Sequence, residues 1–87
     1  MPELCRFKGI VVQMYFKDTK KHYKPHIHVR YGKYNAVFAF DGELLEGKIP
    51  PKQLKQVTAW VTLREDELYT AWTKAVKGEG QPDKIAP

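Results

Sequence analysis

The amino-acid sequence predicts an α+β fold, in which an antiparallel four-stranded β-meander is followed by two α-helices packed on one face of the sheet. Apolar residues alternate with polar ones in the first half of the chain and recur with helical spacing in the second half. Two glycine-containing turn signals separate extended segments of the first half. A chain of 87 residues is long enough for one domain, which we expect to span residues 1–87.

The four predicted strands are bounded by turn and loop residues. The first is rich in β-branched and aromatic residues and places Ile10, Val12, Met14 and Phe16 on one face. A basic loop leads to Pro25, after which the chain becomes extended again. The strands are predicted over residues 7–16, 26–31, 34–40 and 43–49.

The two turn signals, Gly32-Lys33 and Asp41-Gly42, determine the expected register of the meander. As two-residue hairpin turns they pair Tyr31 with Tyr34 and Phe38 with Leu45. Directly opposite residues share a face, so the predicted core face holds Ile27, Val29, Tyr31, Tyr34, Ala36, Phe38, Phe40 and Leu45. The other face should be solvent-exposed and holds His26, His28, Arg30, Asn35, Glu46 and Lys48, with Val37, Ala39 and Leu44 among them.

Helical spacing begins after Pro50-Pro51, because proline ends the sheet and suits the first turn of a helix. Thr62 and Glu65 have the spacing of a capping box, which predicts a break there and a second helix to about Lys77. One bent helix is the alternative. The expected buried positions are Leu54, Val57, Thr58, Val61, Leu68, Trp72, Ala75 and Val76. We expect residues 79–87 to form a loosely held tail.

Composition places the chain among globular proteins, with 43% hydrophobic and 13% aromatic residues. The sequence has no apolar run of membrane-spanning length and no signal-peptide pattern, and Cys5 is its single cysteine. These features predict a cytoplasmic protein with no membrane partner and no internal disulfide. We interpret Cys5 as an ordinary small strand residue.

The formal net charge of +5 is unevenly distributed along the chain. Residues 1–33 carry eight basic and two acidic residues, a balance of +6, whereas residues 34–87 carry seven and eight. Such an excess attracts RNA, DNA or an acidic protein, although solubility alone also explains it. The residues expected to contact a partner or a nucleic acid are Lys20, Lys21, Lys24, Asn35 and Lys48.

His26 and His28 lie two residues apart on a predicted strand and therefore point to the same side. Two imidazoles in this arrangement are half of a zinc or manganese site. We take His22 as the third ligand, with Asp18 or Glu46 as alternatives. The simplest alternative is that both histidines lie on a solvent-exposed face and bind nothing.

The same strand permits a second chemistry. His26 and His28 could act as acid and base, with Arg30 and Lys48 binding a phosphate. Metal-independent cleavage of RNA needs these groups and no protein nucleophile, because the 2′-hydroxyl of RNA attacks the phosphate. The catalytic candidates are therefore His26, His28 and Arg30.

The chain resembles the bacterial domain-of-unknown-function family 4160 over nearly its whole length. The resemblance rests above all on the segment His22-Tyr23-Lys24-Pro25-His26-Ile27-His28, and it continues in Asp41-Gly42-Glu43, Gly47-Lys48-Ile49-Pro50, Trp60 and Glu67-Leu68. Lys24 and Ile27 depart from the family pattern, which has Pro and Phe there. The three histidines match that pattern, which supports a shared site without deciding its chemistry.

This resemblance implies a small bacterial protein of a family without an agreed activity. Such proteins are similar to ones encoded beside a second small protein, an arrangement that suggests a toxin–antitoxin pair. The expected function is therefore an interaction module that binds the product of a neighbouring gene. RNA is the other expected partner.

Overall fold

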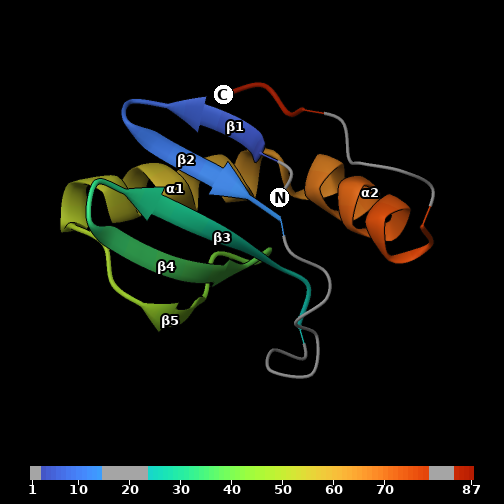
Figure 1. Cartoon of the computed structure of the whole chain (residues 1–87), viewed down its shortest axis with the longest axis horizontal. Coiled ribbons are helices and arrows are strands. Elements are labelled where there is room, and N and C mark those ends of the chain that lie inside the picture. The colour runs from blue at the N-terminus through green and yellow to red at the C-terminus, as the bar shows by residue number, and fades with distance from the viewer. Residues whose placement is uncertain (1–2, 15–23, 79–83) are drawn as a thin grey trace.

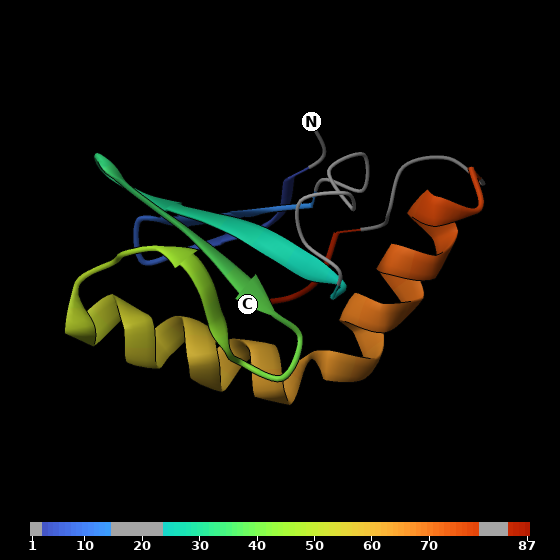
Figure 2. The ribbon, with the colours of Figure 1, turned by 90° about the horizontal axis from the view of Figure 1, so that it is seen from below.

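The computed structural model describes residues 3–14, 24–78 and 84–87, which form one antiparallel sheet and two helices (Figure 1). The five strands lie in the order of the chain, β1-β2-β3-β4-β5. Both helices follow the sheet in the chain, and α1 runs beneath one of its faces (Figure 2). The α+β class and the antiparallel meander are thus confirmed, and the elements are β1 (Glu3–Phe7), β2 (Ile10–Gln13), β3 (His26–Tyr31), β4 (Tyr34–Ala39), β5 (Leu44–Gly47), α1 (Pro51–Leu63) and α2 (Glu65–Val76).

The sheet has five strands because the first predicted strand is in fact the hairpin β1–β2. The chain reverses at Lys8 and Gly9, whose φ angles of 49° and 78° fit a tight turn and bring Phe7 opposite Ile10. Lysine is uncommon in the left-handed region, so Lys8-Gly9 is a weak turn signal in the sequence. Ile10, Val12 and Met14 nevertheless share a face as predicted, since all three are fully buried. Phe16 lies outside the described residues.

The β3–β4 register is as predicted, with Ile27 opposite Phe38, Val29 opposite Ala36 and Tyr31 opposite Tyr34. The β4–β5 register differs at its turn. Ala39 donates its N–H to the Glu43 carbonyl, which makes a three-residue loop of 40–42, so Phe38 pairs with Leu44 instead of Leu45.

The register then shifts by one residue between Val37 and Phe38, where β5 has one residue more than β4. As a result Glu46 lies opposite Val37, as predicted. The bulged residue is Leu45, which is half-buried. The predicted pairing is therefore restored before the strand ends.

The helices begin and end close to the predicted positions, but their junction is built differently. Thr62 donates its hydroxyl to the Thr58 carbonyl, and α2 has no side-chain cap, so the predicted capping box does not form. The acidic first turn of α2, Glu65 to Glu67, and Lys74 in its last turn are as expected. Val76, predicted to be buried, is 55% exposed. Ala71, which is not among the predicted buried positions, is buried.

A single core cluster lies between the sheet and the helices, and the C-terminal segment closes it. Ile85 is buried, its N–H donates to the Leu4 carbonyl, and the indole of Trp60 donates to the Ala86 carbonyl. Residues 84–87 thus contact β1 and α1, whereas residues 79–83 of the expected tail lie outside the described part. No helix within the described residues is long and apolar enough to cross a membrane.

Candidate functional site on the open face of the sheet

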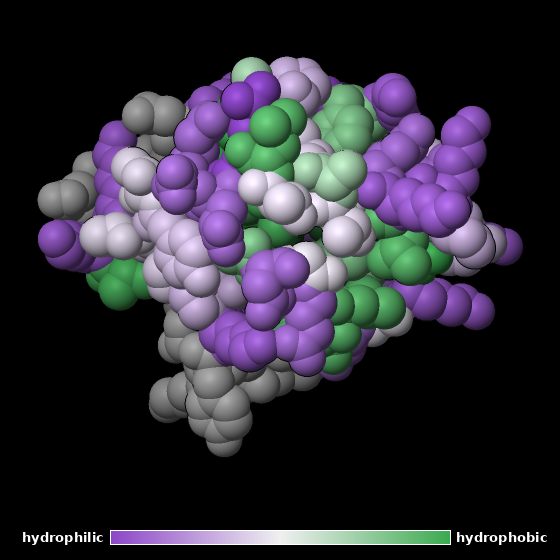
Figure 3. Space-filling model, turned by 180° about the vertical axis from the view of Figure 1, so that it is seen from behind, coloured by the Kyte–Doolittle hydropathy of each residue, from purple (hydrophilic) through white to green (hydrophobic). Residues whose placement is uncertain are grey.

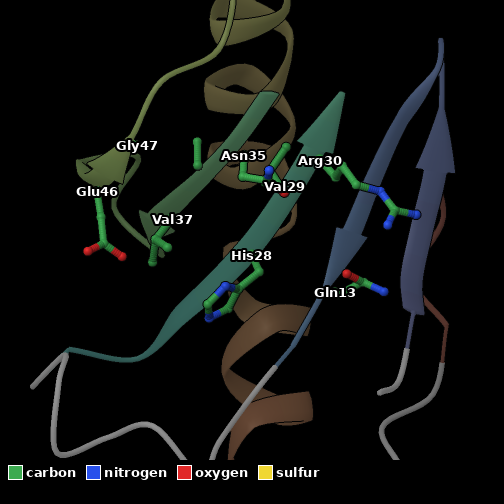
Figure 4. A pocket seen from close by; sticks show the side chains of 9 residues that line it. Gln13, His28, Val29, Arg30, Asn35, Val37, Glu46 and Gly47 are labelled. Carbon is green, nitrogen blue, oxygen red and sulfur yellow. The ribbon is translucent and has the colours of Figure 1, made fainter. Parts of the chain in front are cut away.

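Two rows of side chains cross the face of the sheet that the helices leave uncovered. In the first row Gln13, His28, Val37 and Glu46 lie opposite one another on β2 to β5. The second row contains Arg30 and Asn35. Together they line a shallow hollow of about 340 Å³ (Figure 4).

We call the hollow with its polar rim the open face, defined by Gln13, His28, Arg30, Asn35, Val37 and Glu46. Its rim offers an imidazole, a guanidinium, two amides and a carboxylate, and among the described lining residues no side chain carries a hydroxyl or thiol nucleophile. These groups suit hydrogen bonding and charge recognition more than covalent chemistry.

His26 and His28 point to the same side of β3, as predicted, but their surroundings differ. The ring of His26 lies 5.4 Å from that of His28 and 5.4 Å from that of Trp72, measured between centroids. His26 is fully buried at the end of the sheet where α2 approaches, whereas His28 is half-buried. The expectation that both lie on a solvent-exposed face is therefore wrong for His26, whose ring packs against Trp72 of α2.

A backbone contact selects one tautomer of His26. Its Nδ1 lies 2.9 Å from the Lys24 carbonyl oxygen, which can only accept a hydrogen bond, so Nδ1 carries the proton. In the neutral ring Nε2 is then the nitrogen with a lone pair. A histidine that binds a metal through Nε2 is commonly oriented by such a contact.

The predicted catalytic residues do not converge on one point. The side chains of Arg30 and His28 extend in different directions, with Arg30 directed toward β2 and β1 (Figure 4). His26 has no exposed surface from which to reach a bulky substrate. The arrangement offers no place where all three groups contact one phosphate.

The predicted metal ligands are only partly within the described residues. His26 and His28 are close together, but His22 lies outside the described part. Among the residues that the structure describes, no group of three histidine, cysteine or acidic side chains is placed to hold a metal ion. A site at this position would need a ligand from the segment between β2 and β3.

The residues predicted to contact a partner are dispersed over the molecule. Lys24 forms ion pairs with Asp41 and Glu43 at the β4–β5 turn, while Lys48 lies at the opposite end of the sheet, after β5. Asn35 is exposed on the open face. Lys20 and Lys21 lie outside the described residues.

Gln13 is a member of the open face that is not predicted from the sequence. It faces His28 across the β2–β3 pair, and these strands are joined by a long connection instead of a tight turn. Because only a tight turn determines register from sequence, no local signal places Gln13 beside His28.

A comparison with protein families finds that residues 9–73 match the family described as Domain of unknown function (DUF4160). The chain belongs to this family. The DUF4160 match includes four strands, α1 and most of α2, and therefore all six residues of the open face. No curated protein matches the chain significantly, and neither does any solved structure.

Proposed function

We propose that this DUF4160 protein is an interaction module of a bacterial cytoplasm, one half of a toxin–antitoxin pair, which binds a small protein partner on its open face. The observation that carries the proposal is that α1 lies beneath one face of the five-stranded sheet, while the helices leave the hollow on the other face uncovered. The other face presents a hollow with a polar rim drawn from four strands.

The charges on the open face favour a partner of mixed charge. Arg30 lies on β3 and Glu46 on the outer strand β5, so the rim offers one cation and one anion on opposite sides of Val37 (Figure 4). Complementary charges across an interface determine orientation and partner choice. A small protein with an acidic and a basic side chain at matching separation fits this arrangement.

The edges of the sheet are less suited to docking by strand addition. Residues 84–87 run along the outer edge of β1 and bond to it through Ile85. The outer edge of β5 is four residues long, which limits the number of hydrogen bonds that an added strand can form. We therefore place the partner on the face.

Co-expression with the product of the neighbouring gene tests this function. We expect the two proteins to co-elute in size-exclusion chromatography at micromolar concentration. Arg30→Glu and Glu46→Lys should each weaken the complex at least tenfold, since each brings like charges together. The matched reversals Asp66→Lys on α2 and Lys77→Glu directly after it should leave the affinity unchanged. Separate elution of the wild-type proteins would contradict the proposal.

A metal site at His26 and His28 is the second candidate function, favoured by the contact that fixes the His26 tautomer. His22 is proposed as the third ligand and zinc or manganese as the ion. Protein purified without a histidine tag should then contain stoichiometric metal by elemental analysis.

The melting temperature provides an independent test of this site. Added metal should raise it by mass action, and His28→Gln should abolish the rise. Substoichiometric metal without a thermal shift would rule the site out. The ribonuclease alternative is not favoured, because His26 is fully buried.

A further inference from the structure

One end of the sheet gathers four segments that are far apart in the sequence. The β1–β2 turn and the β3–β4 turn both lie there, because Ile10 is opposite Tyr31, and Tyr31 is opposite Tyr34. The residue after β5 lies there too, since Lys48 donates its N–H to the Asn35 carbonyl. The start of α1 follows Lys48 by three residues and lies at the same end of the molecule (Figure 1).

Each of these four segments contributes an exposed lysine, and we call the group Lys8, Lys33, Lys48 and Lys52 the basic end. Within the described part of the chain, none of the four forms an ion pair. Hydrophilic side chains project together at this end, on the right of Figure 3.

The described acidic residues lie mostly elsewhere. Asp41 and Glu43 occupy the opposite end of the sheet, and three further carboxylates are in the first turn of α2. The basic end is therefore not the same set of residues as the positively charged first third of the sequence. Arg6 and Lys24 are neutralised by ion pairs, while Lys48 and Lys52 come from the second half.

The backbone at Lys8 supports a role for this side chain. A φ of 49° is a left-handed conformation that glycine or asparagine adopts more easily than lysine. Residues held in such conformations are concentrated at functional positions. Lys8 thus occupies this tight turn in a conformation that is unfavourable for its residue type.

Tyr34 adds an aromatic surface to the basic end. Its ring is half-buried and is not among the side chains packed against the core, and Lys33 Nζ lies 5.9 Å from the ring centroid. Aromatic rings beside lysines bind unpaired bases by stacking while the lysines contact phosphates. The four segments spread across five strands, a width of about 19 Å at the usual strand spacing of about 4.8 Å.

We propose that the basic end binds single-stranded RNA through its phosphate backbone, with Tyr34 stacking on a base. Unpaired lysines in separate segments follow a backbone without reading sequence. A stacking ring favours unpaired bases over a duplex, and RNA is the abundant single-stranded nucleic acid of a cell. This surface is distinct from the open face and independent of the partner proposed there.

Fluorescence anisotropy with a labelled 12-nucleotide oligouridine tests the proposal on the full chain. The triple variant Lys33→Gln, Lys48→Gln, Lys52→Gln should bind at least tenfold more weakly than the wild type. The slope of log K against log salt should become less steep by about 2, because each lost phosphate contact on a single strand removes about 0.7. The control Lys74→Gln, Lys77→Gln, Lys84→Gln removes the same charge elsewhere and should change affinity less than twofold.

Two single variants distinguish contacts with the RNA phosphates from stacking of Tyr34 on a base. Tyr34→Leu should weaken RNA binding at least fivefold while leaving the salt slope unchanged. Lys8→Gly should weaken binding while leaving the melting temperature equal or higher, since glycine relieves the left-handed backbone. Loss of binding in Lys8→Gly thus cannot be attributed to unfolding.

Several results would overturn the proposal. Equal weakening in the two triple variants would show attraction to net charge only. Tighter binding of duplex DNA than of single-stranded RNA, or no RNA binding by the wild type at low salt, would exclude a single-stranded RNA surface. An acidic peptide of equal charge that competes as well as the oligonucleotide would indicate a protein partner instead.

Discussion

His26 and His28 point to the same side of β3 but have different surroundings. The ring of His26 lies between those of His28 and Trp72 and is fully buried, while its Nδ1 donates to the Lys24 carbonyl. His28 lies on the half-exposed rim of the open face. Two histidines that are two residues apart on one strand thus differ in burial, because Trp72 of α2 packs against only one of them in the contacts described.

These environments predict different effects of alanine substitution. His26→Ala removes a buried ring and a hydrogen bond, so we expect the free energy of unfolding to fall by about 2–4 kcal/mol. His28→Ala should lower it by less than about 1 kcal/mol. Urea unfolding followed by tryptophan fluorescence measures both. Equal effects of the two substitutions would mean that α2 does not cover the start of β3.

At the scale of elements, the β4–β5 turn depends on a carboxylate. Asp41 Oδ1 accepts a hydrogen bond of 2.9 Å from the Glu43 N–H, and its other oxygen pairs with Lys24, two residues before β3. The Glu43 N–H, more than Lys24, lowers the pKa of Asp41 from its usual 3.8. The charged carboxylate therefore holds the turn and ties β3 to it.

A lowered pKa makes the contribution of Asp41 dependent on pH. The stabilisation is present above pH 3.8, the usual pKa, and is lost as the pH falls through the lower folded-state pKa. Asp41→Asn should melt at a slightly lower temperature than the wild type at pH 7, and the difference should shrink toward pH 2. Thermal melts across this range check it.

Salt provides the control for the Asp41 experiment. Because the main cause is a backbone hydrogen bond, the difference between wild type and Asp41→Ala, which lacks the acceptor, should persist at pH 7 in 1 M salt, which screens the pair with Lys24. A difference that vanishes in high salt would assign the effect to the ion pair.

At the scale of the whole molecule, residues 84–87 join the first strand to the helices. Ile85 bonds to Leu4 of β1 and enters the core, and the next two residues accept hydrogen bonds from Trp60 and Arg64. The two ends of the described chain thus meet on one side of the core. This closure links the edge strand to both the core and the helix junction.

Ile85→Ala should therefore destabilise the whole fold. We expect a loss of about 2–3 kcal/mol in the free energy of unfolding, because a buried apolar side chain is truncated. Trp60 fluorescence should shift as its hydrogen bond to Ala86 weakens. The exposed neighbour Lys84→Ala should change stability by less than about 0.5 kcal/mol. An equally small effect of Ile85→Ala would show that the segment is only loosely attached.

Local sequence signals predicted much of the fold because they act over a few residues. Alternation and the Gly32-Lys33 turn predicted the β3–β4 register residue by residue, and the two prolines and the helical spacing placed α1 and α2. The same pattern placed His28, Arg30, Asn35 and Glu46 together on one face, which the open face confirms. The β1–β2 hairpin escaped prediction because its turn uses a lysine in an unusual conformation.

Only the tertiary structure decided which of these side chains is covered and which distant segments meet. The burial of His26 depends on the position of α2, and the proximity of Gln13 to His28 depends on strands joined by a long connection. The basic end likewise combines two turns, the end of β5 and the first turn of α1. Such contacts follow from packing between elements, whose energy depends on residues far apart in the chain, so no local pattern encodes them.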